Sequence, residues 1–237
     1  MALAPILLGA LSIGATIAHT LAVARGRKKR AGLQGPGPRP VETVTSDAGT
    51  LRRYGEGSEE VSIEDRVYLI QKMVAAGVRD PRMRQLALEI TQRCPARDGE
   101  CEAKAIFDWM TEPTPGHPHG RIRYTGDVGE VVLDPERGRP RKQPESVDLY
   151  ASPMRTIQAG GGDCDDHVAV STALMALNGL DAEVDVSSNE CKTHDHIFAV
   201  VKLPKGTPSR RVPVDTTLGR GAFSRWPRYC SKITFPA

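Results

Sequence analysis

The apolar residues near the start of the chain form one uninterrupted run. From Ala2 to Ala24 there are 23 residues without a charged side chain, enough for a helix that spans a bilayer core of about 30 Å. Five basic residues follow between Arg25 and Arg30, which favours a C-terminal side that stays inside the cell. The pattern therefore predicts a membrane anchor at residues 2–24, with the rest of the chain on the cytoplasmic side.

Two other interpretations of this segment stay open. Ala22-Val23-Ala24 resembles the small-residue site at which a signal peptide is cleaved, and the protein would then be secreted. A signal peptide, however, usually has a basic start and a shorter apolar core, so the anchor is favoured. The third interpretation is a hydrophobic tail buried in an assembly such as a virion.

The pattern changes after the basic cluster. Residues 25–60 are first basic and then rich in Gly and Pro, which is the composition of a linker. We therefore expect a hydrophobic segment at 1–24, a linker at 25–60 and one folded domain at 61–237. Without the basic cluster the charges of the chain nearly balance, and nothing in them indicates a nucleic-acid partner.

Apolar residues recur every three to four positions in the first part of the domain, which predicts helices. The expected helices cover 62–77, 81–92 and 99–110. A further helix-like stretch runs from Cys164 to Leu177, and two apolar runs beginning at His196 and Val212 predict paired strands. Helices followed by antiparallel strands predict an α+β fold.

Three residues of the domain form a candidate catalytic set. Cys164 follows a run of glycines and begins a helix, where free backbone N–H groups and the helix dipole favour a thiolate. His196 begins one strand and Asp215 ends the other, so pairing of the two strands would place the imidazole beside the carboxylate. The three are the residue types of a thiol nucleophile, its base and the group that orients the base.

Acidic residues surround this nucleophile. Asp163 suits the N-cap of the helix, but Asp165 and Asp166 add negative charge that disfavours a thiolate. The imidazolium of His196 is therefore expected to supply most of the activation, and one of the acids to contact an amine of the substrate. His194 is a second candidate for the base or for substrate binding; His196 is preferred because the apolar strand begins there.

These motifs resemble those of the transglutaminase-like superfamily, which has a papain-like fold, and most of all its small bacterial and bacteriophage cysteine peptidases. The similar segments are Gly162-Asp163-Cys164-Asp165-Asp166, His196-Ile197-Phe198-Ala199-Val200 and Val214-Asp215-Thr216-Thr217. The resemblance implies a papain-like α+β fold in which N-terminal helices precede a nucleophile helix packed on an antiparallel sheet. It also implies a cysteine hydrolase or acyltransferase that cleaves an amide or peptide bond through a thioester, without a cofactor. Papain-like enzymes carry an oxyanion glutamine six residues before the nucleophile, which is the position of Gln158 here.

Two alternatives compete with this hypothesis. Cys164, His167, His194 and His196 are the residue types of a zinc site, but their spacing is unusual for structural zinc and leaves Asp215 without a role. The second alternative is a non-catalytic virion structural or assembly protein. Such a protein would retain the fold and insert its N-terminus into a membrane or particle.

The chain has five cysteines, an odd number. If Cys164 is the free nucleophile, Cys94 can pair with Cys101 and Cys191 with Cys230 in an oxidising compartment. A domain that faces the cytosol would keep all five as thiols, and the orientation predicted above favours that state.

Overall fold

The computed structural model describes residues 40, 42–47, 49–54, 62–115, 120–125, 148–191 and 194–237. All of them belong to one compact unit, Gly37–Ala237. The predicted anchor at 2–24, its basic flank and much of the predicted linker lie outside the described residues. No helix of the described part of the chain is both long and apolar enough to cross a membrane.

Three helices open the described domain, as the apolar spacing predicted. They are α2 (Ile63–Arg79), α3 (Pro81–Thr91) and α4 (Gly99–Thr111). Each begins after a residue whose side chain accepts a hydrogen bond from a backbone N–H of the first turn: Ser62, Asp80 and Asp98. These side chains satisfy donors that have no partner inside the helix, which fixes where each helix starts.

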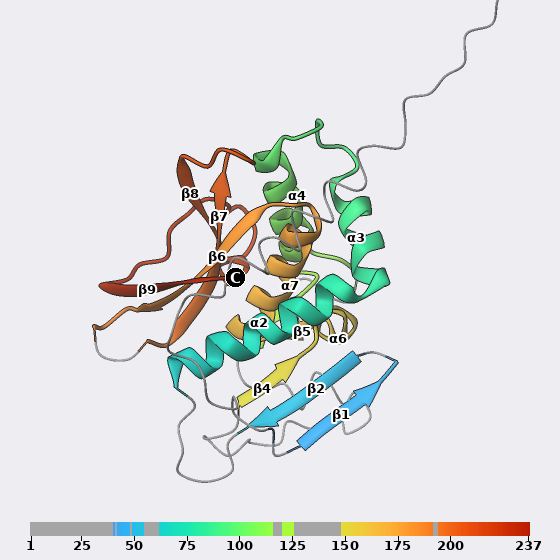
Figure 1. The fold of residues 1–237 in the computed structure, drawn as a ribbon, viewed down its shortest axis with the longest axis vertical. Helices are drawn as coiled ribbons and strands as arrows, with labels where there is room; N and C mark the ends of the chain where they lie inside the picture. The colour runs from blue at the N-terminus through green and yellow to red at the C-terminus, as the bar shows by residue number, and fades with distance from the viewer. Residues whose placement is uncertain are drawn as a thin grey trace, which may run out of the picture. The chain divides into compact units, whose positions relative to one another are not determined.

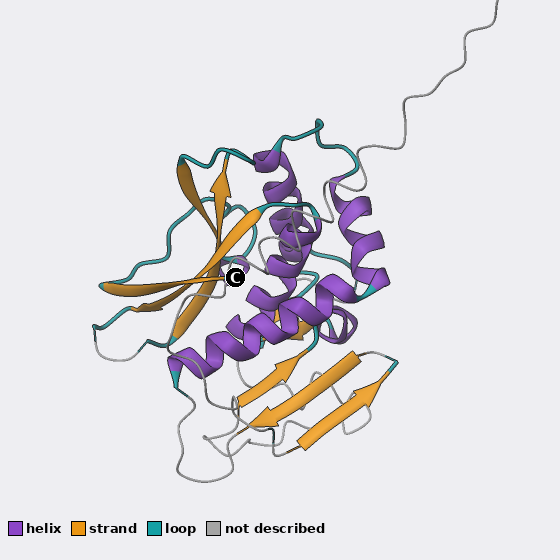
Figure 2. Cartoon of the chain, viewed as in Figure 1, coloured by secondary structure: helices purple, strands orange, loops and turns teal. Residues whose placement is uncertain are grey.

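The second half of the chain forms a four-stranded antiparallel sheet. Its strands are β6 (Asp181–Ser188), β7 (His196–Leu203), β8 (Arg210–Val214) and β9 (Ser231–Pro236). The order across the sheet is β8-β7-β6-β9, so the two strands predicted from His196 and Val212 are neighbours. The fold is therefore mixed α+β with antiparallel sheets (Figures 1 and 2).

A second sheet includes residues that the sequence predicted to be a linker. Two antiparallel strands, β1 (Glu42–Ser46) and β2 (Gly49–Tyr54), lie in this part of the chain, and β2 pairs with β4 (Asp148–Ala151). This three-stranded sheet lies beside α2 and α6 (Pro153–Ala159) (Figure 2). The prediction of a linker was wrong for these residues because the strand that pairs with β2 lies about a hundred residues away.

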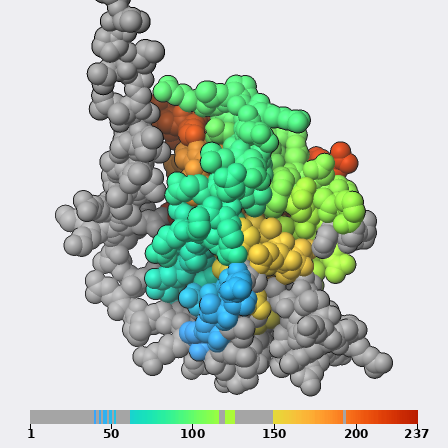
Figure 3. Space-filling model, turned by 90° about the vertical axis from the view of Figure 1, so that its right-hand side faces the viewer, coloured from blue at the N-terminus to red at the C-terminus, as the bar shows by residue number. Residues whose placement is uncertain are grey.

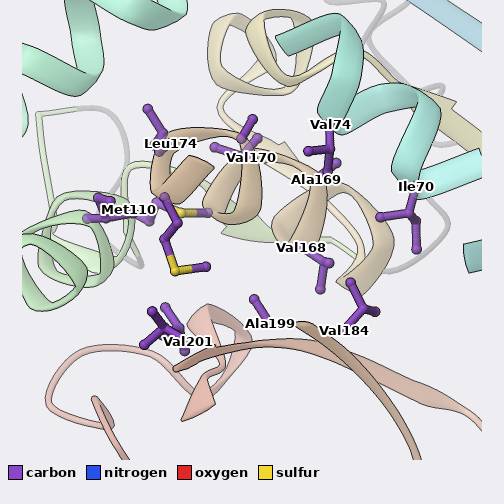
Figure 4. Close-up of a cluster of buried hydrophobic side chains, with 14 of the residues drawn as sticks. Ile70, Val74, Met110, Val168, Ala169, Val170, Leu174, Val184, Ala199 and Val201 are labelled. Carbon is purple, nitrogen blue, oxygen red and sulfur yellow. The ribbon is translucent and has the colours of Figure 1, made fainter. Parts of the chain in front are cut away.

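The central element of the fold is α7 (Cys164–Leu177), which is buried along most of its length. Figure 4 shows it between α2, α4 and the large sheet, which contribute Val74, Met110 and Val201 to the same cluster. A helix that is apolar all round belongs in a core. This packing holds the first residue of α7, Cys164, at a fixed place relative to the sheet. Figure 3 shows α2 and α3 at the surface on one face of the molecule, above β1 and β2.

Four of the five cysteines form disulfides, one between Cys94 and Cys101 and one between Cys191 and Cys230. Their Cα atoms lie 5.6 and 5.5 Å apart, within the range that a disulfide spans without backbone movement. The preference for five free thiols was therefore wrong, because it rested on the predicted membrane orientation and not on the distances between cysteines. Cys164 is not part of a disulfide.

Candidate active site

The nucleophile candidate sits at the very start of the central helix. The side chain of Asp163 caps α7 by accepting hydrogen bonds from the backbone N–H groups of Asp165 and Asp166 at 3.0 and 3.1 Å. Cys164 follows as the first helical residue and is partly exposed. The short strand β5 (Gly161–Gly162), which pairs in parallel with β3 (Arg123–Tyr124), leads into this turn.

A glycine is required just before this turn. A Cβ atom added to Gly162 would lie 2.5 Å from Cβ of Asp166, so any side chain there would displace the first turn of α7. The glycine run that precedes the nucleophile thus permits a close approach between β5 and the helix.

The two acids that follow Cys164 point to different places. Asp165 lies beside the thiol, with 3.9 Å between Sγ of Cys164 and Oδ1 of Asp165. Asp166 is buried and accepts a hydrogen bond from the backbone N–H of Ala151 at 3.2 Å. Burial, together with the charge of Asp165, raises the pKa of Asp166 to about 7. Asp166 therefore carries only part of a negative charge at neutral pH, which reduces the repulsion expected from the sequence.

His196 and Asp215 form a direct pair. Nε2 of His196 lies 2.7 Å from Oδ2 of Asp215, and the Asp215 side chain is 1% exposed. The other carboxylate oxygen, Oδ1, accepts hydrogen bonds from the backbone N–H and the hydroxyl of Thr217 at 3.1 and 2.6 Å. With Nε2 bound to the carboxylate, Nδ1 is the ring nitrogen left to act on a thiol.

A pocket brings His196 and Cys164 together. Its empty volume is about 280 Å³, open solvent included. The residues that line it come from α2, the start of α7 and the β6–β7 hairpin, and they are Ile63, Arg66, Cys164, Asp165, Val186, His194, Asp195, His196 and Ile197. The pocket thus has the thiol, the imidazole, one of the acids and an apolar wall within one concave surface.

The remaining candidates are divided between the pocket and other places. His194 and Asp165 line the pocket, and Nε2 of His194 is buried without a hydrogen-bond partner among the described residues. Asp166 and Gln158 do not line it; Gln158 is an exposed residue of α6. The structure therefore gives no support to Gln158 as an oxyanion donor or to Asp166 as a contact of the substrate.

Two ring nitrogens of the alternative zinc set have other partners. His196 Nε2 binds Asp215, and His167 Nδ1 lies 2.8 Å from the hydroxyl of Thr216. Within the described part of the chain, no three His, Cys, Asp or Glu side chains gather in a way that could hold a metal ion.

An aromatic stack behind the histidine was not predicted from the sequence. The ring of His196 stacks on Phe198 at 5.7 Å between centroids, and Phe198 meets the edge of Trp226 at 6.1 Å. Lys232 and Arg211 flank Trp226 and bind the fully buried carboxylate of Asp185. The sequence contained a signal for this stack, because Phe198 follows His196 by two positions and therefore lies on the same side of β7. The stack restricts rotation of the His196 ring.

No protein-family model matches this chain, and no curated protein matches it in sequence.

Proposed function

We propose that the protein is a cysteine hydrolase or acyltransferase of the transglutaminase-like type, in which Cys164 is the nucleophile, His196 the base and Asp215 the residue that orients the base. The single observation that carries the proposal is the hydrogen bond of 2.7 Å between His196 and the buried carboxylate of Asp215. A buried carboxylate paired with a histidine that shares a pocket with a cysteine thiol is the arrangement that activates a thiol.

The proposed reaction begins with removal of the thiol proton by Nδ1 of His196. The thiolate attacks the carbonyl carbon of an amide, and the oxyanion develops beside the first turn of α7, where the helix dipole favours negative charge. His196 then gives its proton to the leaving amine, and a thioester remains on Cys164. Water activated by the same imidazole releases the acid, or a second amine takes the acyl group.

The arrangement of the elements supports a papain-like fold for this proposal. The proposed nucleophile begins a central helix. The base begins β7, and its partner directly follows the adjacent strand β8 of the sheet that packs against that helix. The substrate class that suits such a site is a peptide or protein amide, because the pocket is open and combines apolar side chains with charged ones.

The disulfides bear on where this chemistry takes place. Disulfides such as Cys94–Cys101 and Cys191–Cys230 persist in oxidising compartments. We therefore favour secretion or an extracellular position of the domain over the cytoplasmic side, in contrast to the orientation predicted from the basic cluster.

The decisive experiment measures alkylation of Cys164 by iodoacetamide as a function of pH, with mass spectrometry to locate the label. The proposal expects alkylation at pH 6 to be at least about 10-fold faster than for an ordinary cysteine, because the imidazolium holds a thiolate. His196→Gln should abolish this advantage. The variant His194→Gln tests the other histidine of the pocket: loss there, with His196→Gln unchanged, would transfer the role of base to His194. Ordinary thiol behaviour of Cys164 in the wild type would contradict the proposal.

A further inference from the structure

A second histidine connects the nucleophile helix to the turn that carries Asp215. His167 lies one helical turn after Cys164 on α7. Its Nδ1 atom is 2.8 Å from Oγ1 of Thr216, the residue directly after Asp215. Thr216 begins η2 (Thr216–Leu218), the short 3-10 helix whose N-cap is Asp215.

The contact lies in the interior. His167 is 2% exposed and Thr216 is 5% exposed. The rings of Tyr124 and His167 meet edge to face at 6.2 Å between centroids. The backbone of Arg123, the carboxylate of Asp215 and the ring of His196 also act on the His167 ring. A hydrogen bond in such a place competes little with water, so its loss leaves a polar group without a partner.

His167 is a neutral group in this setting. Burial is the largest influence and lowers the pKa of His167 to about 4, against the opposing effect of the Arg123 backbone and of Asp215. Above about pH 4 the ring of His167 is therefore neutral and still forms hydrogen bonds. It adds no positive charge that would compete with His196 for the carboxylate of Asp215. A lysine or arginine at this position would add that charge.

Hydrogen bonds connect the position of the Asp215 carboxylate to the helix that carries Cys164. The carboxylate of Asp215 is held on one side by Thr217, through its backbone N–H and its hydroxyl. The adjacent residue, Thr216, is held by His167, which belongs to the same helix as Cys164. The distance between the nucleophile and the Asp215–His196 pair is thus set by a direct connection within the core as well as by the sheet.

We propose that His167 is a positioning residue, which fixes the turn carrying Asp215 to the nucleophile helix through its hydrogen bond with Thr216. This inference rests on the proposed function of Cys164, His196 and Asp215, and it assigns to the Thr216 hydroxyl a role in aligning the base. His167 does not contact the pocket and takes no part in proton transfer.

The test removes the hydroxyl without changing the volume of the side chain. Thr216→Val deletes the hydrogen bond, Thr216→Ser keeps it, and Thr172→Val is the matched control. Thr172 is a buried threonine of α7 whose hydroxyl has no hydrogen-bond partner among the described residues. Thermal unfolding shows that each variant is folded. We expect Thr216→Val to lower alkylation of Cys164 at pH 6 about tenfold, and the other two variants to stay within about twofold of the wild type.

An independent readout separates this inference from the proposed chemistry. In a protein with ¹⁵N-labelled histidine, the Nε2 proton of His196 reports its hydrogen bond to Asp215 by NMR. We expect Thr216→Val to broaden or shift this signal, and Thr216→Ser and Thr172→Val to leave it in place. If wild-type Cys164 is an ordinary thiol, the proposed function fails while the NMR comparison still decides the positioning role. A folded Thr216→Val protein with an unchanged His196 signal would overturn the inference.

A second pair of variants applies if Thr216→Val does not fold. In His167→Asn the side-chain amide reaches about the place of Nδ1, whereas in His167→Gln it reaches about the place of Nε2. The inference expects the His196 signal to be closer to that of the wild type in His167→Asn than in His167→Gln. The reverse order, or equal spectra, would overturn it.

Discussion

The carboxylate of Asp215 binds the ring of His196 at 2.7 Å from a position that is almost entirely shielded from solvent. Its second oxygen is bound by the backbone and the hydroxyl of Thr217. The carboxylate therefore has little freedom to turn away from the imidazole, and the tautomer of His196 with its proton on Nε2 is stabilised.

Replacement of this carboxylate by an amide is expected to keep the fold and remove the activity. In Asp215→Asn the side chain keeps its shape and can still accept from Thr217, but it no longer stabilises an imidazolium. We expect hydrolysis of a susceptible peptide to fall by about 10³–10⁴-fold, with a melting temperature close to that of the wild type. Thr217→Val should give a smaller loss, because it removes one of the bonds that hold Asp215 and leaves the charge. Equal activity of Asp215→Asn and the wild type would contradict the triad.

The buried acid next to the nucleophile gives a prediction about stability and pH. Burial raises the pKa of Asp166 from 3.8 to about 7, so between these values the folded state binds more protons at this residue than the unfolded state. The contribution of Asp166 to the free energy of unfolding therefore falls as the pH rises from about 4 to about 7. Asp166→Asn, which resembles the protonated acid, should remove this dependence. Urea unfolding at several pH values should show the variant gaining stability relative to the wild type across that range.

His167 has the opposite effect on the pH dependence of the free energy of unfolding. Burial lowers its pKa from 6.5 to about 4, so the unfolded state binds more protons there, and stability rises with pH through the same range. The effects of the two residues on the pH dependence of the free energy of unfolding partly cancel in the wild type.

The control for the Asp166 prediction is the difference in free energy of unfolding between Asp166→Asn and the wild type. If this difference does not change with pH, Asp166 is not protonated in the folded state near neutrality.

The disulfides predict a difference between two double variants. Cys191 and Cys230 are separated by 39 residues and Cys94 and Cys101 by 7. Because a longer closed loop restricts the unfolded chain more, removal of the first pair should cost about 4 kcal/mol and removal of the second about 2 kcal/mol. Chemical unfolding of Cys191→Ser/Cys230→Ser and of Cys94→Ser/Cys101→Ser measures both. Equal stability of the two variants and the wild type would show that neither disulfide restricts the unfolded chain.

The pocket offers a second readout for the same variants. Cys191 lies in the hairpin loop that continues to His194 and Asp195, and Cys230 is bound to the neighbouring strand through its backbone N–H and the carbonyl of Ser188 at 2.9 Å. We expect slower alkylation of Cys164 only in Cys191→Ser/Cys230→Ser, since the other disulfide joins α4 to the loop before it.

Sequence patterns predicted the parts of the fold that depend on neighbours along the chain. The three N-terminal helices, α7 and the strands of His196 and Asp215 all carry local signals, such as a capping residue, an apolar period or an alternating run. The order of the catalytic candidates along the chain was likewise enough to expect that His196 and Asp215 meet, since two adjacent antiparallel strands bring them together.

Contacts between distant segments could not be predicted in this way. Strand β2 pairs with β4 and β9 pairs with β6, and neither pairing has a signal within one segment. The same holds for the hydrogen bond between His167 and Thr216, and for Gln158, whose position in the sequence suggested a role that its place on α6 does not support. Local spacing fixes which way a residue points from its own element, but the element that it meets is set by the packing of the whole core.

The first sheet yields a last prediction, which concerns where the folded domain begins. A chain that starts at Gly57 lacks β1 and β2, whereas one that starts at Gly37 keeps them. Without β2, the backbone of β4 loses its partner strand, and Ser152 loses two hydrogen bonds with Thr50. The Ser152 N–H donates to the Thr50 carbonyl at 2.7 Å, and the Ser152 hydroxyl accepts from the Thr50 N–H at 2.9 Å. An exposed strand edge invites pairing with other chains. We therefore expect residues 37–237 to be monomeric and to unfold cooperatively, and residues 57–237 to have a lower melting temperature and to self-associate at high concentration.

Thermal unfolding and light scattering of the two chains test this prediction. If both behave alike, the β1–β2 hairpin contributes nothing to the domain, and the linker predicted up to residue 60 would be the better description of this segment.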